Sequence, residues 1–158
     1  GDIMQSVENA LLIGKISFVM MLLRGQACRS IGFSLLNEAR EKLETVIIRF
    51  CKTYGFSRPR MYRRIARKNY LALAKAKKRS TKKIRATIRK QLAFIRRDIG
   101  YLENFMQDGY APTSKESTLL LTIYKLYEQQ QYIYQNKSHS VDNRIVSIAQ
   151  PWIRPIVR

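Results

Sequence analysis

The sequence contains few of the residues on which metal and disulfide chemistry depends. Its 158 residues include one His, His139, and two Cys, Cys28 and Cys51. Three such side chains cannot supply the four ligands of a structural zinc site. They could form a single disulfide, but a disulfide-dense secreted scaffold is excluded. We expect His139 to lie exposed in a polar loop and Cys51 to be a small core residue.

The chain also lacks long apolar runs and the common catalytic motifs. The apolar run at residues 16–23 is much shorter than the roughly 18 residues of a membrane span. No Gly-rich phosphate loop, His–Glu zinc helix or Gly-x-Ser-x-Gly elbow is present. Glu38, Glu41 and Glu44 follow helical spacing among basic residues, which we interpret as a solvated helix face and not as a metal site.

Acidic residues are missing from the central part of the chain. The sequence has 30 Lys and Arg against 11 Asp and Glu, a formal net charge of +19. Residues 52–97 contain 18 of the basic residues and no acidic residue. A block of one sign favours a polyanionic partner, and nucleic acid is the first candidate. An anionic membrane surface and a merely solvated face remain alternatives.

Apolar residues recur at helical spacing over most of the chain, so we expect a mainly α fold. The first helix is predicted over residues 35–51, with Ser34 as its N-cap and Gly55 after its end. The second runs from Pro59 to about Arg79, because proline suits a first helical turn. The expected buried faces are Leu35, Leu36, Ala39, Leu43, Val46, Ile47 and Phe50, then Tyr62, Ile65, Ala66, Leu71 and Ala74 with Tyr70 at the edge.

Two further helices are predicted in the second half of the chain. The third begins after Ser80 or Thr81 and continues through Met106 along a narrow, nearly heptad stripe. The fourth extends over about residues 115–136 with Ser114 as its cap, and its tyrosines are either core residues or a base-stacking platform. The expected faces are Ile84, Ile88, Leu92, Ile95, Ile99, Leu102 and Met106, then Leu119, Leu120, Ile123, Tyr127 and Tyr134.

Two short segments have the alternation that is typical of β-strands. Residues 144–148 (RIVSI) are the stronger candidate and are ended by Gln150-Pro151. Residues 14–18 (GKISF) are the weaker one. The sequence therefore predicts about four helices bracketed by two short strands.

Basic side chains lie beside the apolar faces of the second and third helices. If the two helices are antiparallel, they present one cationic surface that contacts phosphates, which gives affinity without sequence information. Nothing in the pattern identifies residues that read bases. The candidate DNA-binding residues are Arg58, Arg60, Arg63, Arg64, Arg67, Lys68, Lys77, Lys78, Arg79, Lys82, Lys83, Arg85, Arg89 and Lys90.

Three segments resemble the DDE transposases of insertion sequences, in particular an insertion-sequence-five-like group. They are residues 34–41 (SLLNEARE), the basic tract 68–91, and residues 144–158 (RIVSIAQPWIRPIVR). The last is the most specific, since these enzymes carry a closely similar Arg-Ile-Val-Ser-Ile-x-Gln-Pro run that continues through Arg-Pro-Ile-Val-Arg. The resemblance covers roughly residue 14 to the C-terminus.

The resemblance implies a ribonuclease-H-like core in which three acidic residues hold two Mg²⁺ ions for DNA cleavage and strand transfer. Residues 34–137 would be a basic helical insertion between core strands, and residues 138–158 would begin the next strand. It further implies element-end DNA as the partner, no membrane, and a nucleoid-associated location in a prokaryotic cytoplasm. A homo-oligomer paired through the stripe of the third helix is an open alternative. We expect an internal fragment of the longer enzyme, inactive alone.

The N-terminal part departs from the family pattern. These enzymes carry Asp-Ala-Thr after a strand resembling residues 14–18, and the Asp is the first metal ligand, whereas this chain continues with Val19, Met20 and Met21. Because Met has one codon, Met20-Met21 is encoded ATGATG, which contains the Asp codon GAT in a shifted frame. We expect residues 1–33 to be a degenerate segment with one short strand, frameshifted after residue 18, by gene decay or by a sequence error.

A non-catalytic, basic helical module of the ribosomal-protein type is the alternative function. It would explain the charge equally well, but it does not explain the similarity of residues 144–158 to the transposases. No catalytic and no metal-binding residue is predicted in this chain under either interpretation.

Overall fold

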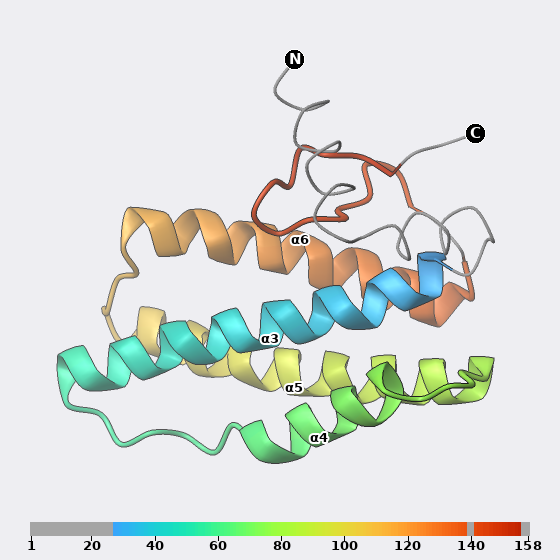
Figure 1. Cartoon of the computed structure of the whole chain (residues 1–158). Helices are drawn as coiled ribbons and strands as arrows, with labels where there is room; N and C mark the ends of the chain where they lie inside the picture. Colours follow the sequence, from blue (N-terminus) through green and yellow to red (C-terminus); the bar gives the residue numbers. More distant parts are fainter. Residues whose placement is uncertain (1–26, 139–140, 156–158) are drawn as a thin grey trace.

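The structure is a computed structural model that describes residues 27–138 and 141–155 (Figure 1). Most of these residues belong to four α-helices. They are α3 (Ala27–Tyr54), α4 (Arg63–Ala74), α5 (Thr81–Gln107) and α6 (Ser114–Asn136). The prediction of a mainly α fold is confirmed. His139 and the strand predicted over residues 14–18 lie outside the described residues.

Successive helices run in alternating directions, so that α3 and α5 lie in the middle of the arrangement (Figure 1). The most extensive helix contact is the one between α3 and α5. α4 and α6 each pack against both of these helices and, within the described part of the chain, do not contact one another. One side of α4 therefore remains open to solvent.

The core follows the apolar stripes that the sequence predicts for the three long helices. All seven predicted residues of α3 are buried, and Leu36, Leu43 and Ile47 are fully enclosed. In α5, Ile95 and Leu102 have no exposed surface. The stripe of α5 packs within its own chain, so an oligomer would need another surface. The tyrosines of α6 that pack against this core are Tyr124, Tyr127 and Tyr134.

Helix ends differ from prediction in two places. α3 begins at Ala27 and continues through Gly32, so Ser34 lies inside the helix and is not its N-cap. Of the two predicted candidates for the α5 cap, Ser80 and Thr81, the cap is Ser80, since its Oγ accepts a hydrogen bond from the Lys83 amide at 3.2 Å. The α6 cap is Thr113, and not Ser114, and it forms a capping box with Glu116.

α4 is shorter than predicted and turns a different face inward. It spans Arg63–Ala74, and its fully buried positions are Ala66 and Leu73. Ile65, predicted to be buried, is 60% exposed. The prediction placed Ile65 on the buried face of α4, but that face is defined by Ala66 and Leu73, which are seven residues apart. Ile65 lies about 100° around the helix from Ala66 and therefore points away from the core.

The prediction of a strand over residues 144–148 is wrong, because this segment forms no strand in the structure. A strand needs a ladder of backbone partners. Here the Ile145 amide instead donates to Oε1 of Gln129 at 2.9 Å, and Gln129 Nε2 donates to the Asn143 carbonyl at 3.0 Å. Ile145 and Ile148 are nevertheless buried, so the segment closes the core beside α6.

Aromatic rings fasten the end of α3 to the end of α5. Phe105 stacks on Phe50 with centroids 5.6 Å apart and on Phe56 with centroids 5.1 Å apart. Tyr54 and Tyr110 complete the group at 4.7 Å. Gly55, with φ 74, allows the tight turn that brings Phe56 back onto these rings. The cluster thus fixes the start of the connection that leads to α4.

Replacing Ile95 by Ala tests this packing. Ile95 is 0% exposed, so its truncation leaves a cavity and should lower the free energy of unfolding by about 2–5 kcal/mol. The matched control is Ile65→Ala, where the side chain is 60% exposed and the change should be within about 0.5 kcal/mol. Urea unfolding of both variants measures the difference, and equal effects would contradict the fold.

Candidate nucleic-acid interface

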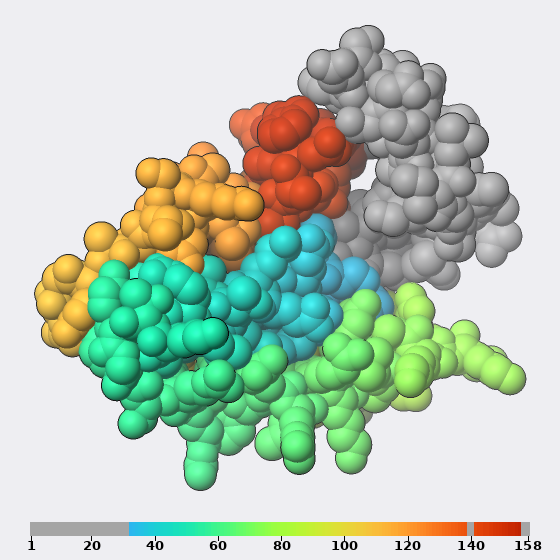
Figure 2. All heavy atoms as spheres, turned by 60° about the vertical axis from the view of Figure 1, so that its left-hand side comes forward, coloured from blue at the N-terminus to red at the C-terminus, as the bar shows by residue number. Residues whose placement is uncertain are grey.

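Most of the predicted DNA-binding side chains are exposed, and they lie on α4, on the first half of α5 and on the two connections beside them. Arg79 and Arg85 are the exceptions, since both are only partly exposed. Figure 2 shows long side chains projecting from the α4 segment along one edge of the molecule. The exposed members are Arg58, Arg60, Arg63, Arg64, Arg67, Lys68, Lys77, Lys78, Lys82, Lys83, Arg89 and Lys90.

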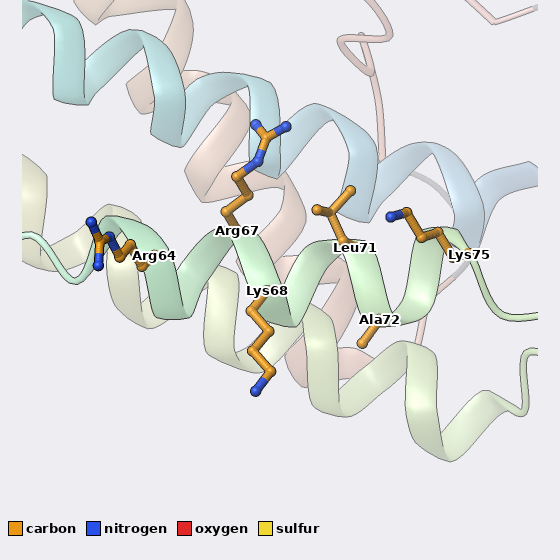
Figure 3. Close-up of a pocket in the computed structure, with 6 residues that line it drawn as sticks. All are labelled: Arg64, Arg67, Lys68, Leu71, Ala72 and Lys75. Carbon is orange, nitrogen blue, oxygen red and sulfur yellow. The ribbon is translucent and has the colours of Figure 1, made fainter.

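The outer side of α4 carries a shallow depression of about 450 Å³ (Figure 3). Leu71 and Ala72 provide apolar surface there between four cations. Arg67 points toward α3, while Lys68 points in the opposite direction (Figure 3). Lys75 belongs to the same stripe but was absent from the predicted set, although its distance of seven residues from Lys68 could have identified it. The lining residues are Arg64, Arg67, Lys68, Leu71, Ala72 and Lys75.

Two cations of this surface are paired with carboxylates of α3. Arg63 Nε lies 3.3 Å from Oε2 of Glu44, and Arg67 Nη1 lies 3.6 Å from Oε1 of Glu41. Both guanidinium groups are more than half exposed, so these pairs contribute little to stability. They do place α4 against α3.

Arg79 and Arg85 have structural contacts that reduce their availability to a ligand. Arg79 donates to the Ala74 carbonyl at 2.8 Å, and Arg85 donates to the Tyr134 carbonyl at 3.0 Å. Arg85 also lies 4.3 Å from the centre of the Tyr134 ring. Arg64 and Lys68 form no ion pair with the described residues, so their charged groups can contact solvent or a ligand.

A buried polar network lies beneath the basic surface and was missed by the sequence analysis. Arg40 is 1% exposed and pairs with Glu44 one turn further along α3. It also donates to Oδ1 of Asn37 at 2.6 Å and to Oε1 of Gln91 at 3.0 Å. Glu44, predicted to lie on a solvated face, is 4% exposed, because the helix face that carries it turns toward Arg40 and α4. The sequence feature that could have predicted this network is the position of Arg40 within the apolar stripe of α3.

Gln91 extends this network from α5 to α4. Its Nε2 donates to the Ala66 carbonyl at 3.0 Å and to Oδ1 of Asn69 at 3.1 Å. Since its Oε1 accepts from Arg40, one amide connects three helices. A buried amide with this many partners fixes the position of the helix that it bonds.

The start of α4 is held by a second set of contacts. Tyr62 adopts the left-handed conformation with φ 56, which is uncommon for a residue with a side chain. The guanidinium of Arg97 lies 4.5 Å from the centre of the Tyr62 ring. Tyr101 donates its hydroxyl to the Arg60 carbonyl at 2.9 Å. Both contacts join the N-terminus of α4 to α5.

Asp98 is a carboxyl group enclosed below this surface. It is 0% exposed, and neither carboxylate oxygen has a hydrogen-bond partner among the described residues. Burial, and after it the charge of Glu44, raises the pKa of Asp98 to about 7, against the opposing effect of Arg40 and Arg97. A proton on this carboxyl removes the buried negative charge.

The described residues contain no other obvious chemical centre. No group of three or more His, Cys, Asp or Glu side chains among them could hold a metal ion. Cys51 is a free thiol that is 4% exposed, as predicted for a core residue, and burial raises its pKa. In the same part of the chain, each helix is too short or too polar to cross a membrane.

Comparisons of the chain with protein-family models, with curated proteins and with solved structures find no match.

Replacing Asp98 by Asn tests the buried carboxyl. The folded pKa lies above the ordinary value of 3.8, so folding favours the protonated form. The stability contribution is present below about pH 4 and is lost as the pH rises through about 7. Relative to Asp98→Asn, the wild-type chain should lose on the order of 4 kcal/mol across this window.

The measurement for Asp98 is urea unfolding of both chains at a series of pH values. Comparing the two chains at each pH cancels the contribution of groups that do not interact with Asp98, so the difference reports on this carboxyl and its immediate neighbours. Parallel stability curves would show that the Asp98 carboxyl is not protonated on folding.

Proposed function

We propose that α4 and the first half of α5 form a surface that binds the phosphate backbone of DNA. The observation that carries this proposal is the separation of charge in the fold. Residues 52–97 contain 18 basic residues and no acidic one, and most of these side chains point into solvent. A surface on which exposed cations far outnumber the nearby carboxylates repels itself unless a polyanion covers it.

The geometry suits phosphates better than a small anion. The cations lie along a helix, with Arg64, Lys68 and Lys75 on one stripe that extends over about 16 Å. Duplex DNA offers a row of charges along each strand, and exposed Lys and Arg side chains can follow it. If six phosphates are neutralised, the logarithm of the affinity should fall with the logarithm of salt with a slope near about −5.

We further infer that this surface belongs to a fragment of a DDE insertion-sequence transposase. The support is the similarity of residues 34–41, 68–91 and 144–158 to that family. On this proposal the helices are an insertion in a ribonuclease-H-like core, whose sheet would form only with the other parts of the parent enzyme. Its Mg²⁺ ions would be held by three carboxylates, and we assign none of them to this chain. The segment would contribute phosphate contacts at the element ends.

Charge reversal at Arg64, Lys68 and Lys82 tests the DNA-binding surface. All three are exposed, so the variants should fold while the favourable phosphate contacts become repulsive. The triple Glu variant should bind duplex DNA at least roughly tenfold more weakly, with a salt slope smaller by about 3. Fluorescence anisotropy with a labelled duplex over a salt series measures both quantities.

The matched control reverses three exposed lysines outside the basic block, Lys115, Lys125 and Lys137. Its net charge changes by the same amount, so it separates a local surface from a general attraction. An equal loss of affinity in both triple variants would reject α4 and α5 as the binding surface.

The alternative, a helical RNA-binding module of the ribosomal-protein type, is tested with the same protein. A structured RNA and a duplex DNA of equal charge compete for the wild-type chain. The transposase proposal expects the duplex to compete at least as well as the RNA, whereas a clear preference for the RNA would favour the alternative.

A further inference from the structure

An exposed isoleucine interrupts the basic surface of α4. Ile65 is the third residue of the helix and is 60% exposed. Arg64 precedes it and Lys68 follows one turn later, and both are exposed cations. Single apolar residues on a surface are common, so exposure alone assigns no role to Ile65. Its position relative to the cations is more informative.

Ile65 lies on the edge of α4 that faces α5. Asn69, one helical turn further on, accepts a hydrogen bond from Gln91 of α5 at 3.1 Å. At the start of the helix, Tyr62 packs under the guanidinium of Arg97 with 4.5 Å to the ring centre. Because Tyr62, Ile65 and Asn69 follow one another at steps of three and four, all three share this edge.

Exposed cations therefore flank Ile65 on two sides. Arg64 and Lys68 form a row on α4, and Lys90 and Arg97 are the exposed cations of α5 beside Gln91 and Tyr62. Two packed helices have axes about 8–10 Å apart, so long side chains on them can span a groove of about 12 Å. Ile65 is an exposed apolar residue between the two rows.

We propose that Ile65 contacts DNA bases, by packing against the 5-methyl groups of thymine in the major groove. This role rests on the proposed function of α4 and α5, which would hold phosphates on the two sides of that groove. The thymine methyl is the apolar group that the major groove presents, and apolar side chains recognise it by contact. Ile65 would then give a basic, otherwise sequence-independent surface a preference for A·T pairs.

Two other occupants fit the surface less well. A side chain that inserts between base pairs must enter the stack completely, and Ile65 is partly covered in its own fold. A protein partner would have to place carboxylates opposite both cation rows around one apolar contact. DNA already combines two rows of anions with an apolar group between them.

The test uses the full chain and two duplexes that differ only by the thymine methyl groups. One is an alternating A·T duplex, and the other carries uracil in place of every thymine. The wild-type chain should bind the thymine duplex about fourfold more tightly, which is the factor expected for one buried methyl group. Ile65→Ala should bind the two duplexes equally, and fluorescence anisotropy at fixed salt measures the four affinities.

Leu121→Ala is the matched control, because Leu121 is an apolar residue of α6 with 61% exposure. This variant should keep the wild-type preference for thymine. Ile65→Val retains a branched apolar side chain and should keep most of it. An equal preference in wild type and Ile65→Ala, or no preference in wild type, overturns the proposal.

The outcomes also separate this inference from the function on which it rests. If charge reversal at Arg64, Lys68 and Lys82 weakens binding while the methyl effect is missing, only the role of Ile65 is rejected. If that charge reversal leaves DNA affinity unchanged, the DNA-binding surface itself is rejected, whatever Ile65 does.

Discussion

The buried guanidinium of Arg40 is the interaction on which the arrangement of the helices depends. It lies between α3 and α5, and Glu44 neutralises its charge. Gln91 of α5 accepts a hydrogen bond from Arg40 and donates one to the backbone carbonyl of Ala66 in α4. Removing one member of such a pair leaves an uncompensated buried charge, which typically costs about 3–5 kcal/mol. The core therefore has one register in which Arg40, Glu44 and Gln91 all find partners. An apolar core alone would tolerate sliding of α4, and this network does not.

Charged residues of opposite sign differ in this fold both in the helix that carries them and in how deeply they are buried. Carboxylates of α3 pair with Arg40 below the surface and with Arg63 and Arg67 at its edge, whereas no ion pair among the described residues involves Arg64, Lys68 or Lys75. Asp98 is the one enclosed acid of α5, and a proton, not a cation, neutralises it near pH 7. The structure thus encloses Glu44 and Asp98, whereas Glu41 remains about half exposed beside Arg67. The exposed positive charge must be stabilised by that ligand or tolerated as self-repulsion.

Sequence reasoning succeeded where one physical rule acted alone. The stripes of α3, α5 and α6 were predictable because long apolar periodicity leaves a helix one face to bury, and Ser80 was predictable because a free amide needs an acceptor. It failed where a partner decided the outcome. Ile65 was predicted to lie in the core because the apolar residues of a helix of only 12 residues allow more than one choice of buried face. Residues 144–148 alternate like a strand, but no strand lies beside them among the described residues, and the Ile145 amide bonds to Gln129 instead. The enclosed polar residues have no periodic signal, since each depends on an atom of another helix.

The candidate binding surface depends on α4, the helix with the least support of its own. A helix of 12 residues is marginal in water, so tertiary contacts must hold it. Those contacts lie on its inward side and at its start, through Gln91 and through the packing of Tyr62 under Arg97. None of them uses the outward stripe of Arg64, Lys68 and Lys75. The same helix can therefore be fixed by the core and remain free to bind, because its inward contacts leave Arg64, Lys68 and Lys75 to a ligand.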